Sequence, residues 1–406
     1  MVKRFWIGEH HKRIVSKKTL LKVMSYLDSH DLHTPLLLMD GEKIVENAKK
    51  VGQFLGGRAF YAVKANGDKK VLSLLRDVDM GFEIASEGEL ELLASVGVEP
   101  ERIITSNPIK SVGFIEALFH YGVRYFVFDS ASELEKLEKY APGCRVYIRL
   151  SVPNEGAEWP LSKKFGVELE DALSLMKMAH KNKKVVPVGI TFHVGSQCLN
   201  TYNWCIAIDK ARRLWEMCRE EGIFLKMLNI GGGYPISYRR VAPRIEEVEK
   251  EIMGYLRERF PSEVEVFLEP GRAVVGDAGV MVSRILGVAR RGFENWLYLD
   301  VGVFNGLMES LGGIRYSWIP QQPSSSPLSV EGESALDGYH RGTEMLYKKW
   351  TVAGPSCDSM DVIDKNVEMP SSLEVGSLML IPSAGAYTVS YASEFNGFPV
   401  PAVEII

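Results

Sequence analysis

Short apolar runs alternate with longer amphipathic stretches from about residue 35 to residue 275. Stretches such as Ser130–Tyr140 and Leu169–His180 carry apolar residues at helical spacing. Repeated strand–helix alternation predicts a parallel sheet, and about seven or eight units in this length favour a closed (β/α)8 barrel over an open doubly wound sheet. The expected strands are Pro35–Met39, Ala59–Val63, Tyr125–Phe128, Val146–Leu150, Val188–Phe192, Leu228–Ile230 and Val264–Leu268.

The pattern changes after Gly276, where strand-like segments follow one another without matching helices. This predicts a second, mostly β domain. We expect residues 36–280 to form the α/β barrel domain, and residues 1–35 together with 281–406 to form the β domain. Within the β domain, the segment 321–345 begins with a Ser- and Pro-rich stretch, which predicts an exposed, mobile insertion.

Composition and charge argue against several classes of protein. Hydrophobic residues make up 46% of the 406 residues and charged residues 25%, which is typical of a globular protein. A net charge of −4 gives no electrostatic reason to expect nucleic acid or an anionic membrane as a partner. No stretch approaches the ~20 apolar residues that span a bilayer, and no secretory signal is evident, so we expect a cytoplasmic protein. Five cysteines without a CxxC pair argue against a disulfide framework or a structural zinc site.

Chemically informative residues follow the apolar runs, at the strand ends where barrels carry their catalytic groups. Lys64 follows AFYAV, His193 follows GITF, and Glu269 ends VFLE with Arg272 three residues later. A lysine desolvated in a barrel mouth has a lowered pKa and can form imines. The glycines after LNI, at positions 231–233, would let backbone N–H groups approach a phosphate.

Each of these residues has an ordinary alternative when it is taken alone. Lys64 fits a surface lysine, the glycines fit a tight turn, and His193 fits a hydrogen-bonded core histidine. Glu269 and Arg272 fit a simple ion pair, although Glu269 would also suit a protonated pyridine nitrogen. The combination of a lysine, anion-binding glycines, a carboxylate and an arginine at four strand ends favours a site for pyridoxal 5′-phosphate (PLP).

Six motifs occur in an order that resembles the fold-type III PLP-dependent decarboxylases: FYAVKAN, HVGSQ, NIGGGYP, EPGR, GPSCDSMD and GAYTVSYASEFNGFP. The resemblance is greatest to the bacterial ornithine/lysine decarboxylases, as AEWPLSKKFG (residues 157–166) and YLDVGVFNG (residues 298–306) also suggest. It extends from about Pro35 to Pro399. It implies a PLP-binding barrel, a β domain, and a homodimer with two active sites at its interface.

The resemblance also implies residue roles. Lys64 would hold PLP as a Schiff base, Glu269 would pair with the pyridine nitrogen, and His193 would stack on the ring. Cys357 would enter from the neighbouring subunit as the proton donor, and Asp358 would enter with it to bind substrate. The residues expected at the phosphate are Ser196, Gly232, Gly233, Arg272 and Tyr387, the last also near the substrate. Those expected behind or beside the ring are Glu83, Glu89 and Arg149; many relatives carry Asp in place of Glu83.

The substrate is the least determined part of the prediction. This chain has Gly312–Gly313 about where relatives usually carry acidic residues that hold a distal ammonium group. Losing one such partner removes a hydrogen bond worth roughly 1.5–3 kcal/mol. Either Glu309 replaces it, or Arg315 faces a substrate with a distal carboxylate or acyl group. The hypotheses are therefore a decarboxylase of ornithine or lysine, a decarboxylase of a modified or acidic amino acid, and a non-catalytic regulator.

We predict that Cys357→Ala retains the cofactor but loses clean amine formation, because the thiol that protonates the carbanion is gone. The measurement is cofactor absorbance together with product analysis by mass spectrometry. Unchanged turnover and an unchanged product would remove Cys357 from the mechanism.

Overall fold

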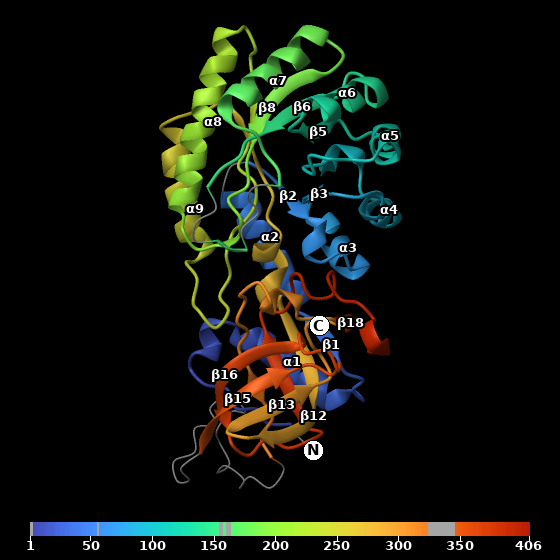
Figure 1. Ribbon diagram of the computed structural model, residues 1–406, viewed down its shortest axis with the longest axis vertical. Coiled ribbons are helices and arrows are strands. Elements are labelled where there is room, and N and C mark those ends of the chain that lie inside the picture. Colours follow the sequence, from blue (N-terminus) through green and yellow to red (C-terminus); the bar gives the residue numbers. More distant parts are fainter. Residues whose placement is uncertain (1–2, 55–56, 154–156, 160–163, 324–345) are drawn as a thin grey trace. The chain divides into compact units, whose positions relative to one another are not determined.

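The computed structural model describes residues 3–54, 57–153, 157–159, 164–323 and 346–406 (Figure 1). The chain divides into two compact units. The β-domain unit contains Met1–Ile44, Ile236–Ala242 and Val275–Ile406, and the barrel unit contains Val45–Pro235 and Pro243–Val274. The insertion expected over residues 321–345 lies, from residue 324 onward, outside the described residues.

Eight parallel strands form the barrel in the order β4-β3-β2-β11-β10-β8-β6-β5. A parallel bridge between Thr105 and Phe126 joins the two ends of this order, so the sheet closes on itself. The barrel prediction is therefore confirmed, and the open-sheet alternative is wrong. The strands are β2 (Arg58–Ala62), β3 (Gly81–Glu83), β4 (Ile103–Ile104), β5 (Tyr125–Phe128), β6 (Arg145–Arg149), β8 (Val186–Thr191), β10 (Met227–Asn229) and β11 (Glu265–Leu268).

Helices alternate with these strands and lie around the outside of the barrel (Figure 1). Several begin at a side chain that accepts a hydrogen bond from the first helical turn, as Ser86 does for α4 and Ser130 does for α6. Such caps fix the point at which each strand-to-helix loop ends. The helices are α2 (Gly41–Phe54), α3 (Lys69–Asp77), α4 (Glu87–Ser95), α5 (Val112–Tyr121), α6 (Ala131–Tyr140), α7 (Leu169–Asn182), α8 (Tyr202–Glu220) and α9 (Ile245–Arg257).

The barrel interior is filled by side chains from several strands. Phe60 and Phe267 pack with their ring centroids 4.9 Å apart. Burial of each such side chain contributes roughly 1.5–3 kcal/mol. The members of this cluster are Phe60, Ile104, Val127, Tyr147, Met227 and Phe267.

The second large sheet also has eight strands and belongs to the β-domain unit. Helix α1 (Lys17–Ser29) contributes Leu20, Val23 and Leu27 to a core cluster with residues of this sheet. This organisation confirms a mostly β second domain. The strands are β1 (Leu36–Met39), β12 (Gly279–Arg291), β13 (Glu294–Leu299), β14 (Ile319–Pro320), β15 (Tyr347–Ala353), β16 (Val362–Pro370), β17 (Leu378–Pro382) and β18 (Ala402–Ile405).

The expected barrel strand at Pro35–Met39 is wrong. Strand β1 pairs antiparallel with β12 and parallel with β18, so it belongs to the β-domain sheet. All four of its residues are buried, and a short, fully buried apolar run has the same pattern in either kind of sheet. The observed units accordingly differ from the expected boundaries at residues 36 and 280.

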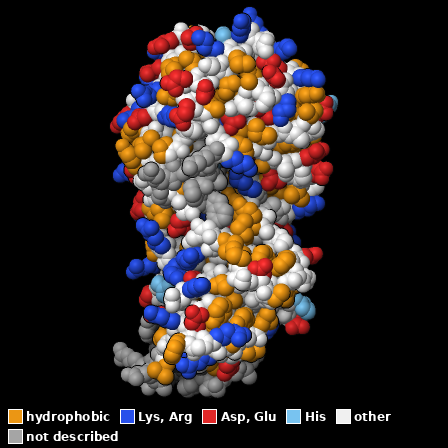
Figure 2. Space-filling view, in the orientation of Figure 1, with side chains coloured by type: hydrophobic (Ala, Val, Ile, Leu, Met, Phe, Trp, Pro, Cys, Tyr) orange, Lys and Arg blue, Asp and Glu red, His pale blue; other side chains and the backbone are white. Residues whose placement is uncertain are grey.

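Charged side chains of both signs occur over the face drawn in Figure 2. In the described part of the chain, no helix combines the length and the apolar character needed to cross a bilayer.

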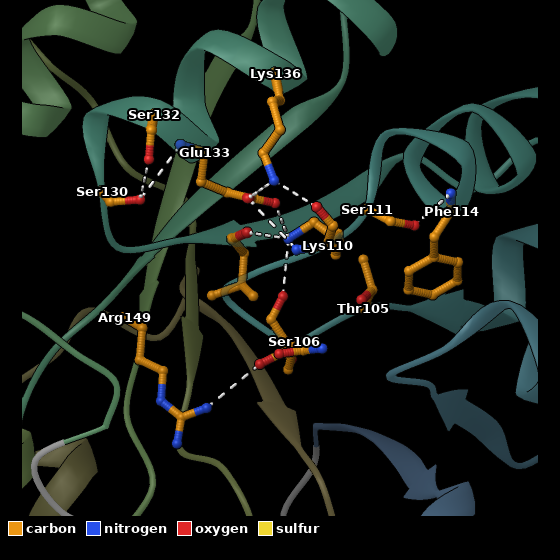
Figure 3. A network of polar contacts seen from close by, with 12 residues as sticks. Thr105, Ser106, Lys110, Ser111, Phe114, Ser130, Ser132, Glu133, Lys136 and Arg149 are labelled. Carbon is orange, nitrogen blue, oxygen red and sulfur yellow. Dashed lines mark hydrogen bonds and ion pairs between the residues drawn. The ribbon is translucent and has the colours of Figure 1, made fainter.

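A buried ion pair supports the loop between β4 and α5. Lys110 donates from Nζ to the carbonyl oxygens of Asn107 and Val127, both at 2.8 Å, and lies 2.9 Å from Oε1 of Glu133 (Figure 3). Burial lowers the pKa of Lys110 to about 8, although Glu133 acts in the opposite direction. Lys136 contacts the other oxygen of Glu133 at 2.5 Å. These contacts tie the loop to β5 and to the first turn of α6.

We predict that Lys110→Met destabilises the barrel unit by about 3–5 kcal/mol, because Glu133 loses a buried partner and two carbonyl groups lose their donor. The measurement is the free energy of unfolding from urea titration. Lys177→Met is the control, since Lys177 pairs with Glu221 at 2.8 Å on the surface and should change stability by less than about 1 kcal/mol. Equal effects of the two substitutions would contradict this account of Lys110.

Candidate active site

The carboxyl ends of the barrel strands bring together residues that are far apart in sequence. Lys64 lies in a short 3-10 helix (Val63–Ala65) directly after β2, and Glu269 directly follows β11, the strand that pairs with β2. Parallel strands place all these ends on one side of the barrel. The other predicted residues at these ends are Glu83 on β3, Arg149 on β6, His193 after β8 and the glycines after β10.

Glu269 is the most constrained carboxylate of the site. Its side chain is buried, and Oε1 accepts hydrogen bonds from Nδ2 of Asn229 at 2.6 Å and from the hydroxyl of Ser106. Burial is the largest cause and the nearby charge of Glu83 the second, and together they raise the pKa of Glu269 to about 7. The two hydrogen bonds and the charge of Lys64 act against this rise. The opposing influences leave the pKa of Glu269 at about 7, well above that of an exposed carboxylate.

Sequence reasoning missed Ser106 and Asn229. Ser106 follows β4, which has only two residues and did not register as an apolar run. Asn229 is the last residue of β10 and stands within the run Leu228–Ile230, where it was counted as part of a strand. A polar residue inside an otherwise apolar run was the available signal for Asn229.

Three carboxylates and two cations lie near one another at this end of the barrel. Burial raises the pKa of Glu89 to about 7, and Glu83 raises it while Lys64 lowers it. Burial lowers the pKa of Arg149, whereas Glu269 and Glu83 raise it. A positive charge on a ligand would favour the ionised forms of Glu269 and Glu89.

Lys64 differs from expectation in one respect. Its side chain is exposed in the single chain, so the amine is accessible and not desolvated as predicted. The charge of Lys64 nevertheless influences Glu269, Glu89 and His193. Its position just after the carboxyl end of β2 explains both observations, because this end faces the mouth of the barrel instead of its packed interior.

His193 is held in a neutral form. Its Nδ1 accepts a hydrogen bond from the backbone N–H of Gly195 at 3.0 Å, which requires that nitrogen to be unprotonated. Burial lowers the pKa of His193 well below its usual value, and the charges of Arg149 and Lys64 add to this effect. A neutral, flat imidazole can stack on an aromatic ring without adding positive charge to the site.

The glycine loop and Arg272 form a cradle suited to a phosphate. A Cβ added at Gly232 would lie 2.3 Å from the carbonyl oxygen of Glu269, and one added at Gly233 would lie 2.3 Å from that of Gly195. Arg272, which is buried, donates from Nη2 to the hydroxyl of Ser196 at 3.1 Å. Backbone amides, a hydroxyl and a guanidinium group are the donors that bind phosphate oxygens. The residues present therefore fit the phosphate of PLP.

The remaining predicted residues lie in the β-domain unit, which the structure describes separately from the barrel. Cys357 and Asp358 are exposed neighbours before β16. Glu309 is buried in a 3-10 helix (Met308–Ser310). Arg315 donates from Nη1 to the carbonyl oxygen of Ser310 at 2.8 Å, and its Nε lies 4.0 Å from Asp364. Tyr387 has a left-handed backbone conformation with φ 55°.

Comparisons with known proteins identify the family of this chain. A family model for the pyridoxal-dependent decarboxylase, pyridoxal binding domain, matches residues 42–276. Lysine/ornithine decarboxylase of Selenomonas ruminantium is 35% identical over 372 residues, covering 90% of this chain and 88% of that protein. Antizyme inhibitor 2 of Xenopus laevis is 33% identical over 349 residues, covering 84% and 74%. The structure of lysine/ornithine decarboxylase from Vibrio vulnificus complexed with cadaverine matches with a TM-score of 0.83 and 30% identity, covering 97% and 100%.

We predict that Gly232→Ala weakens PLP binding by about tenfold or more, because the added Cβ collides with the backbone of Glu269 and displaces the cradle. The measurement is the PLP dissociation constant from absorbance titration. Gly254→Ala is the control: Gly254 lies inside α9 with nothing within 4 Å of an added Cβ, so affinity should not change. Wild-type affinity in Gly232→Ala would contradict the role of the loop.

Proposed function

Because this chain belongs to the pyridoxal-dependent decarboxylase family, we propose that it releases the α-carboxylate of lysine or ornithine as CO2 and forms the corresponding diamine. The observation that carries the proposal is the pairing of β2 with β11, which brings Lys64 and Glu269 to neighbouring strand ends. When bound, PLP supplies an electron-withdrawing ring that accepts the electron pair left by departing CO2.

In this proposal Lys64 and Glu269 both hold the cofactor, each through a different group. The amine of Lys64 would hold the cofactor covalently and would give way to the amine of the substrate. Glu269 would keep the pyridine nitrogen protonated, and its hydrogen bonds from Asn229 and Ser106 favour the charged carboxylate that this role needs. The pKa of Glu269 is raised to about 7, mainly by burial, and a cationic partner would lower it.

The other barrel residues fix the orientation of the cofactor and of the bond that breaks. Gly232, Gly233, Ser196 and Arg272 would hold the phosphate, with Tyr387 as a further donor. His193 would cover one face of the ring, while Glu83, Glu89 and Arg149 set the surrounding charge. By holding the phosphate and covering one ring face, these residues would fix the orientation of the substrate and thereby select the bond that breaks.

A basic substrate has support from this chain's own residues. Asp358 and Glu309 are the candidate partners of a distal ammonium group, and Glu309 lies three residues before Gly312, where relatives carry acidic residues. Arg315 is already engaged with the carbonyl oxygens of Ser310 and Ile314, which disfavours its use for an acidic substrate. The relative from Vibrio vulnificus is a lysine/ornithine decarboxylase complexed with the diamine cadaverine.

A homodimer in the cytoplasm is part of the proposal. Cys357 and Asp358 are exposed in the single chain, as residues that complete a neighbouring subunit's site would be. Cys357 would then protonate the carbanion. The hypothesis of a non-catalytic regulator requires loss of the attachment lysine or the thiol, and this chain has both Lys64 and Cys357.

The experiment is CO2 release from a panel of α-amino acids by the PLP-loaded protein. We expect release from lysine or ornithine, with cadaverine or putrescine as product. In Lys64→Ala, both the release and the near-visible absorbance of the attached cofactor should be lost, since no other amine is assigned to hold it. No CO2 release from lysine or ornithine, together with release from another amino acid, would overturn the substrate proposal. An unchanged absorbance band in Lys64→Ala would overturn the assignment of Lys64 as the attachment residue.

A further inference from the structure

Ser106 connects the loop after β4 to the carboxylate of Glu269. The side chain of Ser106 is buried, and its hydroxyl lies between Oε1 of Glu269 and the hydroxyl of Tyr147, which is 2.8 Å away. The contact with Glu269 spans 163 residues of sequence. Ser106 therefore makes a polar contact in the proposed cofactor site, although none of the expected residue roles includes it.

The direction of the hydroxyl proton follows from its neighbours. Tyr147 has one hydroxyl proton. It donates this proton to the carbonyl oxygen of Thr105 at 2.8 Å, because a carbonyl oxygen can only accept. Burial raises the pKa of Tyr147 well above its usual value, and the charge of Glu269 raises it further, so Tyr147 stays a neutral donor. Since an ionised carboxylate also only accepts, the proton of Ser106 points toward Glu269 whenever Glu269 is charged.

Two donors from different strand ends converge on the same oxygen of Glu269. Asn229 at the end of β10 and Ser106 after β4 both reach Oε1. Rotation of the carboxylate would break both hydrogen bonds at once. This arrangement stabilises the charged form and holds the plane of the carboxylate in one orientation.

The backbone around Ser106 is held from both sides. Its N–H donates to Oε1 of Glu83 at 3.2 Å. Arg149 donates from Nη1 to the carbonyl oxygen of Ser106 at 3.4 Å (Figure 3). The next residue, Asn107, donates to the carbonyl oxygen of Ala85 at 3.2 Å and accepts at its own carbonyl oxygen from the buried amine of Lys110. Ser106 is therefore fixed by contacts that do not depend on its side chain.

We propose that Ser106 is a positioning residue whose hydroxyl keeps Glu269 anionic and correctly oriented for the cofactor. The inference rests on the proposed function, in which Glu269 serves the pyridine nitrogen. It adds a requirement for this chain: the buried carboxylate depends on a serine delivered by the loop that Lys110 and Glu133 support.

The test compares Ser106→Ala with Thr105→Val in the PLP-loaded protein. Thr105 is the matched control because it is buried beside Ser106, and its hydroxyl has no hydrogen-bond partner among the described residues. Valine keeps the shape of threonine, and the backbone carbonyl that accepts from Tyr147 remains. The measurement is the pH at which half of the cofactor is released on acidification, followed by absorbance after equilibrium dialysis against buffers of fixed PLP concentration.

We expect the release midpoint of Ser106→Ala to move to higher pH by about one unit, because loss of a donor raises the pKa of the carboxylate. Between the two midpoints, the PLP dissociation constant should be about tenfold weaker than that of the wild type. Thr105→Val should keep the wild-type midpoint. A purely structural role of Ser106 would lower the thermal unfolding temperature without moving the midpoint.

An unmoved midpoint in Ser106→Ala, or an equal shift in Thr105→Val, would overturn the inference. Because the readout is cofactor retention, a wild-type protein that binds PLP but decarboxylates neither lysine nor ornithine would refute the proposed substrate and leave this test intact. A wild-type protein that retains no PLP would overturn both proposals.

Discussion

The buried carboxylate of Glu269 is the constraint around which the barrel unit is organised. A carboxylate removed from water loses hydration worth several kcal/mol unless other groups replace it. Asn229, Ser106 and the charge of Lys64 act in that direction, yet burial and Glu83 leave the pKa of Glu269 at about 7. A cationic ring nitrogen beside Glu269 would supply the stabilisation of the charged carboxylate that the protein's own groups do not. The proposed cofactor would therefore complete the set of interactions around Glu269.

The closed barrel explains how so many polar groups reach one place. Seven of the eight parallel strands carry a named site residue at or just after their carboxyl ends, and the buried cluster between the strands fixes their spacing. The loop after β4 needs separate support, because β4 has only two residues. The Lys110–Glu133 pair supplies that support with contacts to β5 and α6. Stability of this loop and chemistry of the site are therefore linked through one short segment.

The sequence predicted the barrel from its long apolar strands and failed where strands are short or equally buried in either sheet. Strands β3 and β4 have three and two residues and were not predicted, although β10, which also has three residues, overlaps a predicted run. Strand β1 looked like a barrel strand because all of its residues are buried, but its partners are β12 and β18. Pairing depends on which strand ends meet in space, and the local pattern contains no such information.

The residues of the candidate site were likewise predicted only in part. Lys64, His193 and Glu269 were found because each follows a recognisable apolar run. Ser106 and Asn229 were missed because their importance lies in contacts with Glu269 across 163 and 40 residues of sequence. Residues expected to contact the cofactor stand in recognisable motifs, whereas residues that hydrogen-bond to another site side chain are identified only from the fold.

The most direct measurement is an experimental structure of the cofactor-loaded enzyme. The account predicts electron density that continues from Nζ of Lys64 into the cofactor, with the carboxylate of Glu269 beside the pyridine nitrogen at the opposite end of the ring. A cofactor joined to a different lysine, or a Glu269 carboxylate turned away from the ring nitrogen, would contradict it.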